Sequence, residues 1–257
     1  MASRRRPSTV LVTGASSGIG RALALEYARR GAKVAVLARR APELEALCVD
    51  VAKAGGKAVA VPCDVTDPAA ATEAVRRADH ELGSLDMVIA NAGVGRVRRA
   101  TRLSPEDVTS VVDVNVRGAL VTLTAAIPIL LTQKHGHLVG VSSLAGRLAL
   151  PAVGAYNASK AALSSFLETL RLDLGPLGID VTDVQPGFVD TPMGAGSKHP
   201  RPFQWDAERA ASTIADRLER APRVIAFPWP LDLLTRLSRV LPYPLYAALV
   251  RTTASAG

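Results

Sequence analysis

Residues 13–20 read Thr13-Gly14-Ala15-Ser16-Ser17-Gly18-Ile19-Gly20 and join a short apolar run to a stretch of helical character. Glycine allows a tight turn and a close approach of backbone to a phosphate, and the free N–H groups at a helix start bind anions. An ordinary glycine turn is the alternative. The spacing is G-x-x-x-G-x-G rather than G-x-G-x-x-G, but its position after the first strand favours nucleotide binding.

Outward from this loop, short apolar runs alternate with helical stretches. We predict strands at residues 9–12, 33–37, 58–61, 86–90, 137–141, 180–184 and 224–227. We predict helices at residues 19–30, 42–53, 68–82, 156–174 and 207–220, and within 105–133. This alternation predicts an α/β fold, a doubly wound parallel sheet of about seven strands with helices on both faces. Ligands of such sheets bind beyond the carboxyl ends of the strands.

The composition suits one globular domain. The chain has 257 residues, 48% of them apolar and 21% charged, which excludes a disordered or collagen-like chain. Two cysteines, Cys48 and Cys63, favour a reducing compartment, so we expect a cytoplasmic protein. The histidines form no zinc pattern with them, and we predict no metal. We see neither a signal peptide nor an uninterrupted apolar run of membrane-spanning length.

The positive charge is unevenly distributed. The net charge is +8, and residues 1–40 hold nine basic side chains against one acidic one, Glu26. We expect residues 1–7, with Arg4, Arg5 and Arg6, to be a disordered basic tail. This tail is short and aromatic residues make up only 4% of the chain, so we expect no nucleic-acid binding.

Several further motifs appear in order along the chain and resemble those of the short-chain dehydrogenase/reductase family. After the glycine-rich loop come Asn91-Ala92-Gly93, Asn115 within Val114-Asn115-Val116, and Ser143 thirteen residues before Tyr156. Tyr156-Asn157-Ala158-Ser159-Lys160 is similar to the family's Tyr-x-x-x-Lys motif. Residues 186–191, from Pro186 to Thr191, resemble the segment that cups the nicotinamide. The resemblance implies a Rossmann-like domain, for which we predict residues 8–230.

The resemblance also implies roles for four residues. Tyr156 would be the acid/base, and Ser143 would hydrogen-bond the substrate oxygen, although a turn serine is the alternative. Lys160 would bind the nicotinamide ribose and tune Tyr156. Asn115 would hold a water that links Lys160 to solvent, with a mid-helix amide as the alternative.

The tyrosine and lysine make chemical sense on their own. Tyr156 and Lys160 are four residues apart on a predicted helix, so their side chains share a face. A free phenol has a pKa of about 10, and a nearby ammonium lowers it. We therefore expect Lys160 to lower the pKa of Tyr156, so that the phenol exchanges a proton while hydride moves.

The choice of cofactor follows from charge. An acidic residue at the end of the second strand would bind the ribose of NAD, whereas arginine accommodates the 2′-phosphate of NADP. That position is Ala38, and Arg39 and Arg40 follow. We predict NADP(H) in preference to NAD, and a helix-opening pair of solvated arginines is the alternative. The predicted cofactor-binding residues are Gly14, Ser16, Ser17, Gly18, Ile19, Gly20, Arg39, Arg40, Asp64, Val65, Asn91, Ala92, Gly93, Tyr156, Lys160, Pro186, Gly187, Val189 and Thr191.

Two segments bear on the substrate. Residues 193–203 match the family's mobile lid, and no fixed acidic or basic pocket is readable there. Residues 231–257 form an extension whose first part, 231–241, reads as an amphipathic helix that Pro242 and Pro244 end. Packing on its own domain or on a partner subunit is favoured for it over a substrate cap or a membrane-surface anchor.

We therefore predict an NADP(H)-dependent oxidoreductase acting on a carbonyl/alcohol pair, and the apolar extension suggests a lipophilic substrate. The resemblance implies a homodimer or homotetramer. A non-catalytic, cofactor-sensing binding protein on the same fold is the alternative, because fold alone does not give function.

Overall fold

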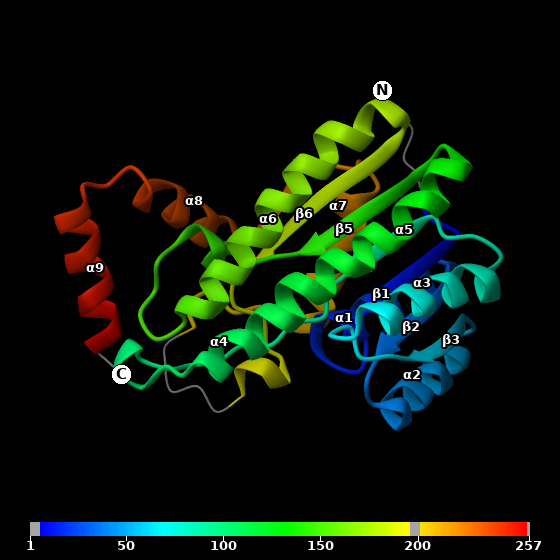
Figure 1. Ribbon diagram of the computed structural model, residues 1–257, viewed down its shortest axis with the longest axis horizontal. Helices are drawn as coiled ribbons and strands as arrows, with labels where there is room; N and C mark the ends of the chain where they lie inside the picture. The colour runs from blue at the N-terminus through cyan, green and yellow to red at the C-terminus, as the bar shows by residue number, and fades with distance from the viewer. Residues whose placement is uncertain (1–5, 196–200, 256–257) are drawn as a thin grey trace.

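The computed structural model describes residues 6–195 and 201–255. Seven parallel strands form one sheet in the order β3-β2-β1-β4-β5-β6-β7, as Figure 1 shows. The chain runs outward from β1 in both directions, so the topological switch point, where ligands of such sheets bind, lies between β1 and β4. The strands are β1 (Thr9–Thr13), β2 (Lys33–Ala38), β3 (Lys57–Pro62), β4 (Met87–Ala90), β5 (Gly136–Val141), β6 (Ile179–Pro186) and β7 (Val224–Phe227). The predicted doubly wound α/β fold is confirmed.

Helices cover both faces of the sheet. The core on one face is formed with α1 (Gly18–Arg29), α2 (Ala41–Lys53) and α7 (Ala207–Leu218). The core on the other face is formed with α3 (Pro68–Leu82), α5 (Ala119–Gln133) and α6 (Gly154–Leu174). Within β1, Val10 and Val12 enter the first core and Leu11 enters the second, because successive side chains of a strand point to opposite faces. Strands buried on both faces are therefore almost wholly apolar.

One long helical segment leads from the loop after β4 along one face of the sheet (Figure 1). It consists of α4 (Pro105–Val112), a π-helical turn (Asp113–Gly118) and α5. Ser104 and Asp107 form a capping box at its start. By length and composition this segment, Pro105–Gln133, could cross a membrane, which was not expected from its sequence. Its α5 part, however, contributes Leu123, Ala126 and Leu130 to the core, as a core helix of a globular protein does.

The two ends of the chain differ from the predictions. Residues 1–5 of the predicted tail lie outside the described residues, but Arg6 is ordered through an ion pair with Glu219 at 2.9 Å. At the other end, α8 (Trp229–Ser238) is followed by a further helix, α9 (Tyr243–Ser255). Pro242 and Pro244 separate the two helices, yet Pro244 sits in the first turn of α9, where its missing N–H has no helical partner to lose.

His137 on β5 illustrates how burial sets charge in this core. Its Nε2 lies 2.8 Å from Thr182 Oγ1, and the Thr182 hydroxyl donates to the Pro222 carbonyl at 2.6 Å. The threonine oxygen is therefore the acceptor, and Nε2 carries the proton. Burial, aided by the Arg171 charge, lowers the pKa of His137 to about 3. The imidazole is neutral in the folded protein at any moderate pH.

We predict that His137 makes the protein sensitive to mild acid. Below the ordinary histidine pKa of about 6.5 the unfolded chain binds a proton that the folded protein does not, so stability falls as pH falls toward 3. Between pH 7 and pH 5 this costs about 2 kcal/mol. The variant His137→Asn keeps a donor for Thr182 but does not titrate, so it should lose less stability over this range. Urea unfolding at both pH values checks this, and equal losses in the two proteins would contradict it.

Candidate active site

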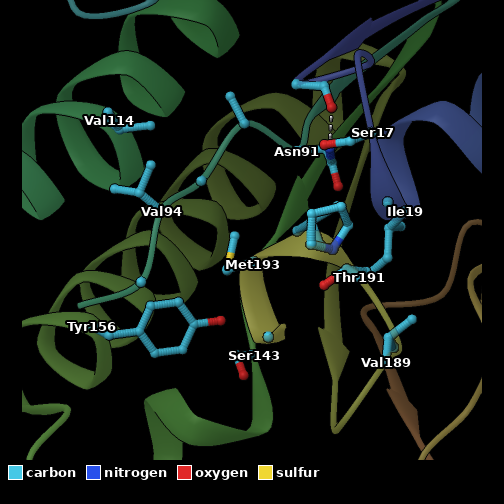
Figure 2. Close-up of a pocket in the computed structure, with 18 of the residues that line it drawn as sticks. Ser17, Ile19, Asn91, Val94, Val114, Ser143, Tyr156, Val189, Thr191 and Met193 are labelled. Carbon is cyan, nitrogen blue, oxygen red and sulfur yellow. Dashed lines mark hydrogen bonds between the residues drawn. The ribbon is translucent and has the colours of Figure 1, made fainter. Parts of the chain in front are cut away.

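An open cleft of about 640 Å³ runs along the carboxyl ends of the strands. Figure 2 shows part of it, with side chains from the glycine-rich loop, the segment after β4, α6 and the segment after β6. All predicted site residues except Gly20 and Asn115 line it: Gly14, Ser16, Ser17, Gly18, Ile19, Arg39, Arg40, Asp64, Val65, Asn91, Ala92, Gly93, Ser143, Tyr156, Lys160, Pro186, Gly187, Val189 and Thr191. Residues from distant parts of the sequence therefore meet in one place.

The glycine-rich loop packs directly on the segment after β4. A Cβ at Gly14 would lie 2.7 Å from Ala92 Cα, and Gly14 has a φ of +66° that favours glycine. A Cβ at Gly20 would lie 2.4 Å from Asn91 Nδ2, so Gly20 packs against Asn91, and its predicted contact with a cofactor stays a prediction. Asn91 Nδ2 also donates to the Thr13 carbonyl at 2.9 Å.

The start of α1 suits an anionic group. In the described chain the N-cap residue, Ser17, makes no side-chain capping hydrogen bond, and the first turn contains no acidic residue. The free backbone N–H groups of the first turn of α1 therefore meet neither a side-chain cap nor a repelling carboxylate. The helix dipole places partial positive charge at this end of α1. Gly18 holds the turn open with a φ of +55°. The residues present fit the pyrophosphate of a dinucleotide.

Cations surround the cleft at the end of β2. Arg40 Nη2 donates to Ser16 Oγ at 2.9 Å, and Arg39 Nη1 lies 3.9 Å from Asp64 Oδ2. Burial acts to raise the pKa of Asp64, but hydrogen bonds from Thr66 and the Arg39 charge outweigh it and leave the pKa below its usual value. Asp64 is therefore ionised and offsets part of the arginine charge. Arg39 and Arg40 both remain largely exposed and can reorient toward a ligand.

Tyr156 and Ser143 meet at the other end of the cleft. Tyr156 extends from α6 with its hydroxyl directed into the cleft near Ser143 (Figure 2). Burial raises the pKa of the phenol, and a hydrogen bond with the Ser143 hydroxyl lowers it by a smaller amount. The pKa of Tyr156 therefore lies above its ordinary value, which is the opposite of the expected effect of Lys160. The phenol keeps its proton at neutral pH.

Lys160 lies one helical turn from Tyr156, with its Nζ 5.7 Å from the centre of the tyrosine ring. This Nζ donates to the Val141 carbonyl at 2.7 Å. Burial lowers the pKa of Lys160 to about 8, although the nearby carboxylate of Asp183 acts against this. The two side chains share a face as predicted, but the ammonium is hydrogen-bonded to β5, near the charge of the buried Asp183, rather than to the phenol oxygen.

Ser142 and Ser143 make different contacts, and the turn-capping role that was the alternative for Ser143 is present, because Ser143 is the N-cap of the short 3-10 turn after β5. Ser142 Oγ bonds the Asp183 carboxylate, so it belongs to the buried network beneath Lys160. Ser143 accepts a bond from Ala145 N at 3.1 Å and donates to the Pro186 carbonyl at 3.2 Å. It therefore joins the loop after β5 to the segment after β6, with its oxygen beside Tyr156.

Asn115 lies in the π-helical turn and is fully buried. Its Oδ1 accepts from Val94 N at 2.8 Å, and its Nδ2 donates to the Val94 carbonyl and to Ser159 Oγ, both at 3.0 Å. The amide thus clamps the segment after β4 and does not reach the cleft. This bonding matches the mid-helix alternative for the side chain, and the water that the resemblance implies stays a prediction.

Several cleft residues were not predicted. The lining also includes Cys63, Val94, Gly95, Arg96, Val97, Val153, Phe188, Met193 and Arg201. Residues 94–97 directly follow Asn91-Ala92-Gly93, so their position in the sequence could have predicted them as cleft residues. Arg201, from the segment that resembles a lid, lines the cleft, and its guanidinium lies against Gly194. Residues 196–200 of that lid lie outside the described residues.

Comparison with known proteins agrees with this geometry. The family model for short chain dehydrogenases matches residues 8–201. An uncharacterized oxidoreductase of Myxococcus xanthus is 46% identical over 243 residues, which cover 95% of this chain and 96% of that protein.

Two solved structures share the fold over most of the chain. A short chain dehydrogenase/reductase of Burkholderia phymatum in complex with NAD has a TM-score of 0.85 and 26% identity, covering 92% of this chain and 94% of its own. An alcohol dehydrogenase of Thermococcus sibiricus complexed with 5-hydroxy-NADP has a TM-score of 0.77 and 28% identity, covering 86% and 94%.

We predict that Asp183 keeps Lys160 cationic. Asp183→Asn removes the buried negative charge but keeps its shape, and Gln185, whose Oε1 has no partner in the described chain, can turn its amide to accept from the new group. The pKa of Lys160 should then fall below about 8. NMR titration of the lysine Cε signals measures it. Asp173→Asn, about 20 Å along α6 from Lys160, is the control. An unchanged Lys160 pKa in Asp183→Asn would refute the assignment.

Proposed function

The chain belongs to the short-chain dehydrogenase family, and on that premise we propose that it is an NADP(H)-dependent oxidoreductase acting on a lipophilic carbonyl or secondary alcohol. The observation that carries this proposal is the placement of Tyr156, Ser143 and Lys160 in the same cleft as the glycine-rich loop and Arg39. Three strand spacings, or about 14 Å, separate β2 from β5, a span suited to a dinucleotide.

In the proposed mechanism Tyr156 is the proton donor for carbonyl reduction. Bound nicotinamide supplies or accepts the hydride at the substrate carbon. Because burial keeps the phenol protonated, Tyr156 can give its proton to the carbonyl oxygen, and Ser143 beside it can hold that oxygen by a hydrogen bond. The Lys160 ammonium, whose charged form the buried Asp183 favours, would place positive charge close to the phenolate that this transfer leaves.

The remaining residues position these groups. Lys160 lines the cleft, and in this proposal it also binds the ribose hydroxyls of the cofactor. Asn115 accepts a hydrogen bond from the backbone of Val94. Gly93 lies between Asn115 and Lys160, since a Cβ there would be 3.4 Å from both Asn115 Oδ1 and Lys160 Nζ. An alanine Cβ at Gly93 would therefore only touch both groups, and a longer side chain would meet the lysine or the asparagine.

The preference for NADP(H) rests on the end of β2. Ala38 occupies the position at which a carboxylate would bind the ribose of NAD, and Arg39 and Arg40 line the cleft beside it. A guanidinium meets a phosphate through paired, charge-assisted hydrogen bonds. Asp64 is the acidic group there, and Arg39 lies close enough to offset it.

A lipophilic substrate is supported by the apolar part of the lining of the cleft that contains Tyr156. This part includes Val94, Val97, Val114, Val153, Phe188 and Met193. Apolar walls with a few convergent polar groups suit an apolar molecule that is oriented through one oxygen.

The replacement Tyr156→Phe tests the proposed chemistry. It removes the proton donor and keeps the ring, so turnover of NADPH with a lipophilic ketone should fall about 10²- to 10⁴-fold while NADPH binding persists. Stopped-flow absorbance measures turnover, and NADPH fluorescence measures binding. Tyr243→Phe, at an exposed position, is the control. Cofactor binding without turnover in the wild type across a broad carbonyl panel would favour the cofactor-sensing alternative.

The replacement Arg39→Ala tests the cofactor preference. Loss of a charge-assisted contact to the 2′-phosphate should raise the KM for NADPH about tenfold and leave the KM for NADH nearly unchanged. Arg76→Ala, which removes an exposed arginine on α3, is the matched control. Equal use of NADH and NADPH by the wild-type enzyme would contradict the preference.

A further inference from the structure

The polarity of α8 is inverted. Its inward stripe consists of Leu231, Thr235 and Ser238, which are 8%, 4% and 8% exposed. Its outward face carries Leu233, Leu234 and Leu237, which are 48%, 52% and 54% exposed. A surface helix of a globular protein normally buries its apolar stripe and exposes its polar one. The exposed leucines of α8 therefore indicate an apolar surrounding outside this chain.

The exposed apolar surface continues beyond α8. We call it the apolar ridge, and its members are Trp229, Leu233, Leu234, Leu237, Val240, Leu241, Tyr243 and Leu245. Figure 1 shows α8 and α9 standing away from the sheet at one end of the molecule. Large contiguous apolar patches are unusual on soluble proteins and mark sites of association.

The ridge is firmly attached to the body. Arg147, which follows Ser143 by one short turn, donates to Asp232 at 2.5 Å and to Thr235 at 3.3 Å. The hydroxyl of Tyr246 on α9 donates to the Ala149 carbonyl at 2.8 Å and accepts from Ala149 N at 2.9 Å. These bonds fix the inner sides of both helices, so the leucines point outward because of the packing and not because the helices are loose.

Positive charge accompanies the ridge. Residues 228–255 contain three arginines, at positions 236, 239 and 251, and one acidic residue, Asp232, which is held by Arg147 and Arg236. A second group of arginines, at positions 96, 98, 99 and 102, lies in the exposed loop after β4. Hydrogen bonds from Arg98 N to Ala152 and from Tyr246 to Ala149 tie that loop to α9 through residues 149–152.

Little acidic charge opposes this group. Asp107 pairs with Arg98 at 3.6 Å, while the side chains of Arg96, Arg99 and Arg102 make no ion pair in the described part of the chain. Apolar residues that include a tryptophan and a tyrosine, flanked by arginines, are the composition of a segment that lies in the surface of an anionic membrane.

We propose that the apolar ridge docks the protein on an anionic lipid surface. The leucines and Trp229 would enter the boundary of the acyl chains, and the arginines at positions 99, 102 and 239 would contact lipid phosphates. A second copy of the chain fits less well. In a symmetric pair the same face meets itself, which would bring the arginines of both copies together.

This docking would place the cleft close to the lipid. A Cβ at Gly187 would lie 2.9 Å from Leu231 Cδ1, so α8 packs directly behind a cleft residue. Val153, which also lines the cleft, follows the loop held by Tyr246. A lipophilic molecule could therefore pass between the lipid surface and the cleft. The docking itself does not rest on the proposed function.

Co-sedimentation of the full-length protein with vesicles tests the proposal. We expect binding to phosphatidylcholine vesicles that contain phosphatidylglycerol to be at least about tenfold tighter than to phosphatidylcholine alone, and to weaken with salt. The variant Leu233→Gln/Leu237→Gln should lose about tenfold or more of this affinity. Its matched control is Leu172→Gln/Leu177→Gln, which alters two leucines elsewhere that are at least as exposed.

Two results would overturn the proposal. One is a wild-type protein that sediments equally with and without anionic vesicles. The other is a wild-type protein that is a dimer in light scattering, while Leu233→Gln/Leu237→Gln is a monomer, and neither protein binds vesicles. A second copy of the chain would then cover the ridge. Thermal unfolding of each variant verifies that it is folded.

Discussion

The structure depends on the close contact between the glycine-rich loop and the segment after β4, at the switch point of the sheet. On one side, Gly14 and Gly20 let the loop lie against Ala92 and Asn91, and Asn91 bonds the end of β1. On the other side, Gly93 leaves room for both Asn115 and Lys160. The three residues of the segment after β4, Asn91, Ala92 and Gly93, thus join the anion-binding start of α1 to Lys160, which lies beside Tyr156. A side chain at Gly14 or Gly20 would have to displace backbone or the Asn91 amide.

The parts of this design that were predictable from sequence are those that local chemistry specifies. Buried parallel strands are apolar on both faces, so all seven strands were located, and the loop glycines and the Tyr156–Lys160 spacing needed only chain geometry. The pKa of Tyr156 was not predictable in this way. Its direction depends on burial, which is a property of the assembled cleft, and on Val141 and Asp183, which draw the lysine charge toward β5 and β6.

The same limit explains the carboxyl-terminal helices and the lid. The spacing of leucines in α8 is identical whether they face the body or face away, so periodicity alone could not tell that Thr235 and Ser238 are the buried residues. Arg201 likewise lines the cleft although it lies outside the motifs. These features follow β6 and β7 in the chain, where loops vary more than the elements that they connect.

The central claim is that this cleft moves hydride between a reduced dinucleotide and a lipophilic carbonyl compound while Tyr156 moves the proton. The most direct measurement is product analysis by mass spectrometry after reaction of the wild-type enzyme with NADPH labelled with deuterium at the transferable position and a lipophilic ketone. The account predicts an alcohol that carries one deuterium on the former carbonyl carbon. If the enzyme binds NADPH but reduces none of a panel of such ketones, so that each ketone is recovered unchanged and without deuterium, this would contradict it.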